Sequence, residues 1–131
     1  MPNRSITQIS LVVDDYDKAI EYFVNKLGFY LIEDNFIPDQ NKRWVVVSPS
    51  KSFGPSLVLA KASNKEQEKA IGNQTGGRVF LFLNTDDFWS DYKAFKDQGV
   101  EFVREPQEHD YGTVAVFKDI FGNLWDLIER K

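Results

Sequence analysis

The sequence repeats one pattern of predicted secondary structure twice, at a fixed offset. Asp15 and Asp86 each precede an amphipathic helical segment, and Gly28 and Gly99 each follow one; both pairs are 71 residues apart (86 − 15 and 99 − 28). A period this long is typical of a duplicated supersecondary unit. A chain of 131 residues is the size of one domain of roughly 100–200 residues. We therefore expect a single domain, residues 1–131, made of two modules.

The first module is predicted to span residues 6–62. Ile9, Leu11 and Val13 alternate with more polar residues, which is the period of a half-buried strand. An amphipathic helix should follow the Asp15 cap and end at Gly28, where a left-handed residue is favoured. Three further strands are predicted after it, at residues 29–33, 43–48 and 56–61.

The second module, residues 78–131, has the same predicted order. A dense apolar strand at residues 79–83 precedes a helix that Asp86 and Asp87 cap, and strands follow at residues 100–104, 113–118 and 123–129. Residues 63–77 between the modules are polar and end in glycine, so we expect a surface linker. A module this small is rarely stable alone, so the two should bury their sheets together or against another chain, and we expect a single cooperative core.

Composition excludes several classes of protein. The chain has no Cys and a single His, His109, so disulfide frameworks, thiolate metal sites and multi-histidine sites are excluded. A net charge of −4 with a pI near 5.0 argues against nucleic acid as a partner. The longest apolar run has five residues, which is too short to span a membrane. We expect a cytoplasmic protein without nucleic-acid or membrane partners.

Three motifs together resemble a known family. They are the run DDYDKAIEYFVNKLGF, the helix end QGVEFV and the closing YGTVAVFKDIFGNLWDLIE. The set is similar to the vicinal oxygen chelate superfamily of glyoxalases, bleomycin-resistance proteins and extradiol dioxygenases. The resemblance implies an α+β fold in which two tandem βαβββ modules form curved sheets around a shared cleft, and it implies a homodimer.

The resemblance also implies positions for metal ligands. In metal-dependent members a divalent ion is held by side chains of the first and last strands of the modules. These positions carry Gln8, Val58, Phe80 and Asp126 here. Phenylalanine and valine cannot bind metal, and a site of this kind needs about three protein ligands. We expect no cofactor; if a divalent metal is bound, Gln8 and Asp126 are its ligands.

Strand alternation suggests what lies in the cleft instead. If Leu81 and its alternate neighbours face the helix, then Arg78, Phe80 and Phe82 face the cleft, as Gln8 and Ser10 do from the first strand. We expect Arg78 or a neighbouring donor to pair with Asp126, because a buried carboxylate without a partner is costly. The alternative is that Arg78 lies on an exposed strand end beside Gly76 and Gly77.

Each aromatic residue, and the single histidine, can be interpreted either as part of a ligand site or as a residue without a binding function. Trp44 and Phe80 suit either a pocket wall or the core, whereas alternation places Trp125 opposite Asp126 and favours the core. His109 lies in a polar stretch predicted to be a loop, where a histidine is usually solvated. Tyr111 follows it and is a candidate ligand contact. The predicted ligand-binding residues are Gln8, Trp44, Arg78, Phe80, Tyr111 and Asp126.

Two functions fit this pattern. The first is a metal-free, glyoxalase/bleomycin-resistance-like protein that binds a small aromatic or cationic, antibiotic-like molecule in the cleft. The second is a lyase, isomerase or dioxygenase of the same superfamily that uses a weak metal site, or Asp126 as a general base. The first predicts reversible binding without turnover, and the second predicts turnover that Asp126→Asn abolishes.

Overall fold

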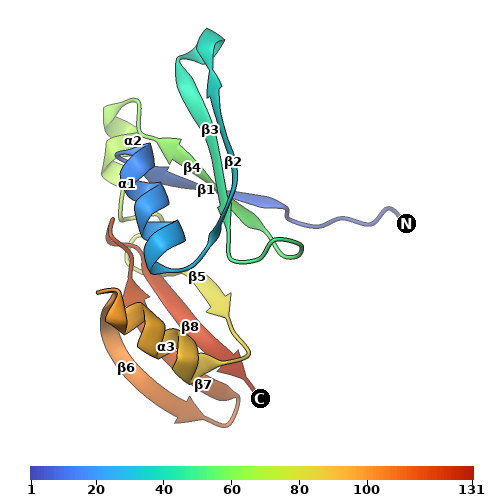
Figure 1. Ribbon diagram of the computed structural model, residues 1–131, viewed down its shortest axis with the longest axis vertical. Helices are drawn as coiled ribbons and strands as arrows, with labels where there is room; N and C mark the ends of the chain where they lie inside the picture. Colours follow the sequence, from blue (N-terminus) through green and yellow to red (C-terminus); the bar gives the residue numbers. More distant parts are fainter. The chain divides into compact units, whose positions relative to one another are not determined.

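The computed structural model describes residues 1–131 as two compact units, Met1–Lys69 and Ala70–Lys131. Each contains one βαβββ module built on a four-stranded sheet (Figure 1). The units are described separately below. No helix in the structure is long and apolar enough to cross a membrane.

The first unit has one helix and four strands in its module. Strand β1 (Gln8–Val13) leads to α1 (Tyr16–Ile20), and this α-helix continues as the π-helix η1 (Glu21–Lys26). Strands β2 (Tyr30–Ile37), β3 (Lys42–Ser48) and β4 (Ser56–Lys61) follow, with the short turn η2 (Pro38–Gln40) between β2 and β3. The sheet order is β1-β4-β3-β2, and only β1 and β4 are parallel.

The second unit repeats this arrangement. It consists of β5 (Val79–Asn84), α3 (Phe88–Asp97), β6 (Glu101–His109), β7 (Gly112–Lys118) and β8 (Leu124–Arg130). The sheet order is β5-β8-β7-β6, again with the first and last strands parallel. The α+β class and the two βαβββ modules predicted from the sequence are confirmed.

The repeat extends to irregularities that the pattern of residues did not reveal. In β2 the register shifts between Leu31 and Glu33, and in β6 it shifts between Phe102 and Arg104, 71 residues later (104 − 33). The helix caps differ slightly from the prediction. Asp15 caps α1 by accepting from the Lys18 backbone N–H at 2.9 Å, but in the second module the cap is Asp87 rather than Asp86.

Two strands are longer than predicted, and the linker is partly helical. β2 continues to Ile37, and β6 continues to His109, so the predicted polar loop that contains His109 is in fact strand. Pro106 lies within β6, where a second register shift between Arg104 and Gln107 and an edge position allow a residue without an N–H. The predicted linker contains α2 (Lys65–Ala70), none of whose residues is buried.

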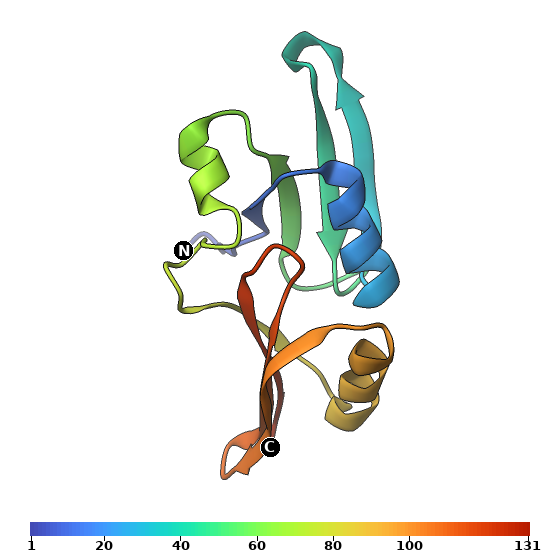
Figure 2. The same ribbon diagram turned by 90° about the vertical axis from the view of Figure 1, so that its left-hand side faces the viewer.

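In each unit the core lies between the sheet and its single long helix (Figure 2). In the first unit Phe23 packs at the helix side with the buried residues of β1, β3 and β4, and Phe23 and Phe29 have ring centroids 5.7 Å apart. In the second unit Phe117 is the centre of an aromatic group and contacts Phe95 and Trp125. The opposite face of each sheet has no helix of its own module against it; we call it the helix-free face.

A buried carboxylate organises the turn between β7 and β8. Asp119 is only 3% exposed, and its Oδ1 accepts hydrogen bonds from the backbone N–H groups of Phe121, Gly122 and Asn123 at 2.9–3.0 Å. Its Oδ2 accepts from Asn123 Nδ2 at 3.1 Å and from Trp125 Nε1 at 3.0 Å. The closing motif of the sequence therefore has a structural role: it fixes the start of β8, the strand that carries Asp126.

Removing this carboxylate should destabilise the protein. Asp119→Ala removes the carboxylate that accepts from two buried side-chain donors and three backbone N–H groups, so we expect a loss of about 3 kcal/mol in the free energy of unfolding. Urea denaturation followed by tryptophan fluorescence measures it. Asp110→Ala, in the exposed turn between β6 and β7, is the control and should change little; equal effects of the two substitutions would contradict this role of Asp119.

Candidate functional site

A row of four residues crosses the helix-free face of the second sheet. The strand register places Phe82 of β5 beside Asp126 of β8, Asp126 beside Val116 of β7, and Val116 beside Arg104 of β6. Residues that are paired across neighbouring strands point to the same face of a sheet. The row therefore presents an aromatic ring, a carboxylate, a methyl surface and a guanidinium, in that order.

Asp126 lies among apolar side chains and has no ion pair or side-chain hydrogen bond in the structure. Its neighbours along β8 on the same face are Leu124 and Ile128, and across the sheet they are Phe82 and the buried Val116. Burial raises the pKa of the Asp126 carboxyl above its ordinary value, and the positive charge of Arg104 partly opposes that shift. The face thus holds a carboxylate that lacks a full partner, while Phe82 beside it is 63% exposed.

The structure places Arg78 away from this row. Arg78 is exposed, it precedes β5, and its backbone carbonyl accepts a hydrogen bond from the Thr75 hydroxyl. The expected pairing of Arg78 with Asp126 is absent, and the alternative of an exposed strand end describes its position. The guanidinium whose charge acts on Asp126 is that of Arg104.

Phe80 lies where the alternation of β5 is interrupted. Val79 pairs with Leu124, on the Asp126 side, while Leu81 pairs with Trp125, on the helix side, and the register shifts between them. The premise that the residues alternating with Leu81 all face the helix therefore fails at Val79, because one extra residue in the strand reverses which side its neighbours face. Phe80 is partly buried at this irregularity, whereas Phe82 shares a face of the sheet with Asp126, as alternation predicted.

Trp125 is a core residue, as alternation predicted. Its side chain is 2% exposed, stacks on Phe117 with ring centroids 5.6 Å apart, and donates its Nε1–H to Asp119.

On the first sheet, Gln8 and Trp44 belong to the helix-free face but to different parts of it. Gln8 is exposed at the start of β1 and pairs with Ser56 of β4. Trp44 lies on β3 opposite Asn35, and its Nε1 donates a hydrogen bond to Glu33 Oε2 at 2.9 Å. The row that corresponds to the Asp126 row contains Ser10, Val58, Val46 and Glu33.

Tyr111 and His109 form a stacked pair at the β6–β7 turn. Their ring centroids are 5.0 Å apart with an interplanar angle of 6°, and Tyr111 is 53% exposed. His109 pairs with Gly112 at the end of β6, whereas Arg104 pairs with Val116, five residues earlier in the strand. The structure therefore separates Tyr111 from the Asp126 row along the sheet.

Glu33 and Arg104 are the site residues that sequence reasoning did not identify. Both follow a register shift in an edge strand, and they occupy equivalent places 71 residues apart. The repeat offset was the signal that could have paired them. Their faces could not be assigned by counting, since each shift changes the alternation of the strand.

Comparison with known proteins assigns the fold to a family. The sequence profile of the Glyoxalase/Bleomycin resistance protein/Dioxygenase superfamily matches residues 5–127. The chain belongs to this superfamily. An uncharacterized protein from Shewanella frigidimarina (strain NCIMB 400) is 64% identical over 96% of this chain and 93% of its own.

Two solved structures of similar proteins support the assignment. UcmS2 has a TM-score of 0.83 with 27% identity, covering 97% of this chain and 98% of that one. TnmS3, described as an antibiotic binding protein from Streptomyces sp. CB03234, has a TM-score of 0.79 with 29% identity, covering 100% of this chain and 99% of that one.

Within this superfamily the present chain has a donor set that does not fit a chelated metal. Of the four positions that the resemblance assigns to ligands, Val58 and Phe80 have no donor atom, and Gln8 offers only an amide oxygen. No group of three or more His, Cys, Asp or Glu side chains that could hold a metal ion occurs in the structure. Val58 of β4 occupies the position in the first sheet that Asp126 of β8 occupies in the second. The first module therefore has valine methyl groups where the second has a carboxylate.

Ionised Asp126 should make the protein less stable. Because the pKa of this carboxyl is raised in the folded state, the folded protein binds more protons than the unfolded chain above pH 3.8, and stability falls as the pH rises through the raised pKa. We expect Asp126→Asn to raise Tm at pH 7 and to give a smaller gain near pH 3, where wild-type Asp126 is protonated.

Thermal denaturation followed by circular dichroism at the two pH values measures this difference. Asp86→Asn, an exposed position in the same unit, is the control for the loss of one negative charge. If Asp126→Asn raises Tm equally at both pH values, or lowers Tm at pH 7, then ionised Asp126 does not destabilise the folded protein.

Proposed function

We propose that the protein binds a small aromatic or cationic organic molecule, similar in kind to an antibiotic, without a metal and without chemical turnover. The observation that carries the proposal is the partly buried carboxylate of Asp126, which has no ion pair and lies between exposed Phe82 and the apolar surface of Val116. Small-molecule sites are mostly apolar with a few polar groups that fix orientation. This row has that composition.

Each group in the row has a definite use in binding. Phe82 offers a ring face for stacking on a flat ligand. Asp126 accepts a hydrogen bond or pairs with a positive charge, and the pairing would be strong because its surroundings exclude water in part. The relative described as an antibiotic binding protein, 29% identical over the whole chain, supports a ligand of this type. Gln8, Trp44, Arg78, Phe80 and Tyr111 stay proposals as ligand contacts; none of them is in the Asp126 row, and Arg78 and Tyr111 lie away from it.

The second candidate is an enzyme in which Asp126 is a general base. The raised pKa of its carboxyl favours this function, because a base is most effective when its pKa approaches the working pH. Arg104, rather than Arg78, would then be the positive group that stabilises developing negative charge. The two candidates differ in one observable, since only the second converts its ligand.

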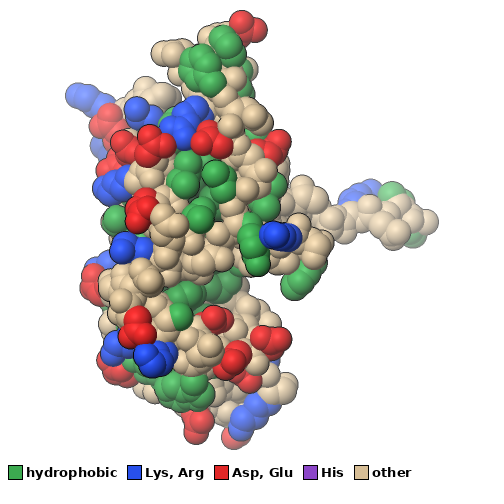
Figure 3. Space-filling view, in the orientation of Figure 1, with side chains coloured by type: hydrophobic (Ala, Val, Ile, Leu, Met, Phe, Trp, Pro, Cys, Tyr) green, Lys and Arg blue, Asp and Glu red, His purple; other side chains and the backbone are tan.

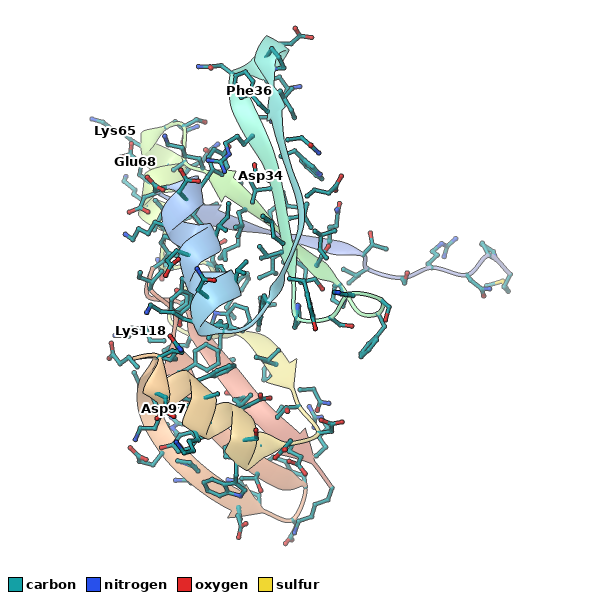
Figure 4. All side chains as sticks on the ribbon, viewed as in Figure 1. Asp34, Phe36, Lys65, Glu68, Asp97 and Lys118 are labelled. Atoms are coloured by element: carbon teal, nitrogen blue, oxygen red, sulfur yellow. The ribbon has the colours of Figure 1, made fainter.

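We also propose that the protein forms a homodimer. Edge strand β2 is exposed along most of its length, and its apolar residues are unusually accessible: Tyr30, Leu31, Ile32 and Phe36 are 43%, 44%, 44% and 61% exposed. Phe36 lies near the tip of the β2–β3 hairpin, where hydrophobic side chains gather at the surface (Figures 3 and 4). Long apolar edges of this kind are usually covered by another chain.

Binding can be tested with planar aromatic amines and quaternary ammonium compounds, each paired with an uncharged analogue of the same ring system. Isothermal titration calorimetry should find saturable binding to the wild type. Asp126→Asn should weaken binding of the charged compound at least about tenfold, which corresponds to about 1.4 kcal/mol. The dissociation constant is the proper readout, because this substitution also alters Tm.

Asp86→Asn is the matched control and should bind as the wild type does. Equal binding by Asp126→Asn and the wild type would remove Asp126 from the site. Mass spectrometry of each bound compound after incubation separates the two candidates: an unchanged compound supports a binding protein, and a product that Asp126→Asn does not form supports the enzyme.

A further inference from the structure

We propose that Trp44 and Glu33 form a recognition site for the ammonium group of a cationic organic ligand, on the helix-free face of β2 and β3. The inference deepens the proposed function, on which it rests, by naming the charged group that the first module would bind. Glu33 has no role in any function considered above.

The geometry fixes the carboxylate against the indole. Trp44 Nε1 donates to Glu33 Oε2 at 2.9 Å, while Glu33 Oε1 has no hydrogen-bond partner. By register Glu33 pairs with Val46 and Trp44 pairs with Asn35, so the two side chains are diagonal neighbours on one face of the β2–β3 pair. Trp44 is partly exposed and Glu33 is exposed, so a ligand can reach both.

The charge of Glu33 is not neutralised, in contrast to that of its neighbour Asp34. Asp34 receives two hydrogen bonds from Arg43, at 3.1 and 2.8 Å, and Arg43 also pairs with Asp17 of α1 at 3.0 Å. Figure 4 shows Asp34 on the same hairpin. Glu33 forms no ion pair. One of two adjacent acids is thus held in an ion-pair cluster on the helix side, and the other remains available on the helix-free side.

The same face already holds an ammonium group of the chain itself. Lys51 Nζ lies over the ring of Tyr30, 5.1 Å from its centroid. Tyr30 pairs with Ser48, and Glu33 pairs with Val46. Ser48 and Val46 are two residues apart on β3, so Tyr30 and Glu33 lie on the same face. Lys51 uses this ring and forms no ion pair with Glu33, so the indole and its carboxylate remain available for a second cation.

Indole and carboxylate are complementary to an ammonium ion. The ring face attracts a cation through its quadrupole, most strongly for tryptophan, and the carboxylate adds a full negative charge. An uncharged molecule of the same shape lacks both attractions. The equivalent position of the second module carries Arg104 instead of an acid, so a carboxylate bonded to an indole is specific to the first module.

Choline is a suitable probe because it is an organic ammonium ion without an aromatic ring. We expect choline, added to the full chain, to shift the indole N–H resonance of Trp44 saturably in proton–nitrogen correlation spectra. The uncharged isostere dimethylbutanol, in which carbon replaces nitrogen, should not shift it. Trp44→Phe identifies the resonance by its loss. The Trp125 resonance is an internal reference, because that indole is buried and bonded to Asp119.

Glu33→Gln should weaken choline binding at least about fivefold, while Glu68→Gln, on exposed α2 (Figure 4), should not. An unchanged circular dichroism spectrum and Tm show that Glu33→Gln is folded, since the Trp125 resonance reports on the other unit. Equal responses to choline and dimethylbutanol, no response to either, or unchanged affinity in Glu33→Gln would each overturn the inference. Because choline has no ring to stack and Asp126 is in the other unit, these outcomes are separable from aromatic-ligand binding that depends on Asp126.

Discussion

Each module has a single long helix to cover a four-stranded sheet, and most of the structure follows from this constraint. One helix covers one face, and Leu11 and Val13 of β1 and Leu81 and Leu83 of β5 lie on that side, while Val46, Val116 and Ile128 are buried on the other face. The other face is free of its own module's helix and can carry residues that would be too costly in a core. Asp126 and Glu33 are both on such faces.

The functional positions depend on how the last strand of each module is fixed. β8 starts after a turn in which the backbone N–H groups of Phe121, Gly122 and Asn123 donate to the buried Asp119 carboxylate. Trp125 donates to the same carboxylate, and Asp126, the next residue, is paired with β5 on one side and β7 on the other. Asp126 therefore has a defined orientation without any bond of its own. A carboxylate held in this way costs stability when ionised, and such a cost is expected at a site that is completed by a ligand.

The sequence predicted the order of elements well, because that order is encoded in local signals. The alternation in β1, the Asp15 cap and Gly28, whose φ is 73°, each correspond to a feature of the structure. The duplication made the prediction of the second module independent of any single signal.

Alternation failed where a strand contains an extra residue. The shift at Phe80 turned Val79 to the other face, and the shifts on either side of Arg104 concealed that Arg104 belongs to the Asp126 row. A bulge depends on pairing with the next strand, so residues of one strand alone do not reveal it. The hydrogen bond between Trp44 and Glu33 was hidden for the same reason, since it crosses between strands on one side of a bulge.

This chain has the fold of its superfamily, and we propose that a surface of aromatic, apolar and charged groups takes the place of metal chelation. The most direct measurement is the metal content of the protein, purified without a metal-binding tag and exposed in turn to Mn, Ni, Zn and Fe, by elemental mass spectrometry. We expect far less than one metal ion per chain for every metal. Near-stoichiometric retention of any of them would contradict it and would make Gln8 and Asp126 the first residues to test as ligands.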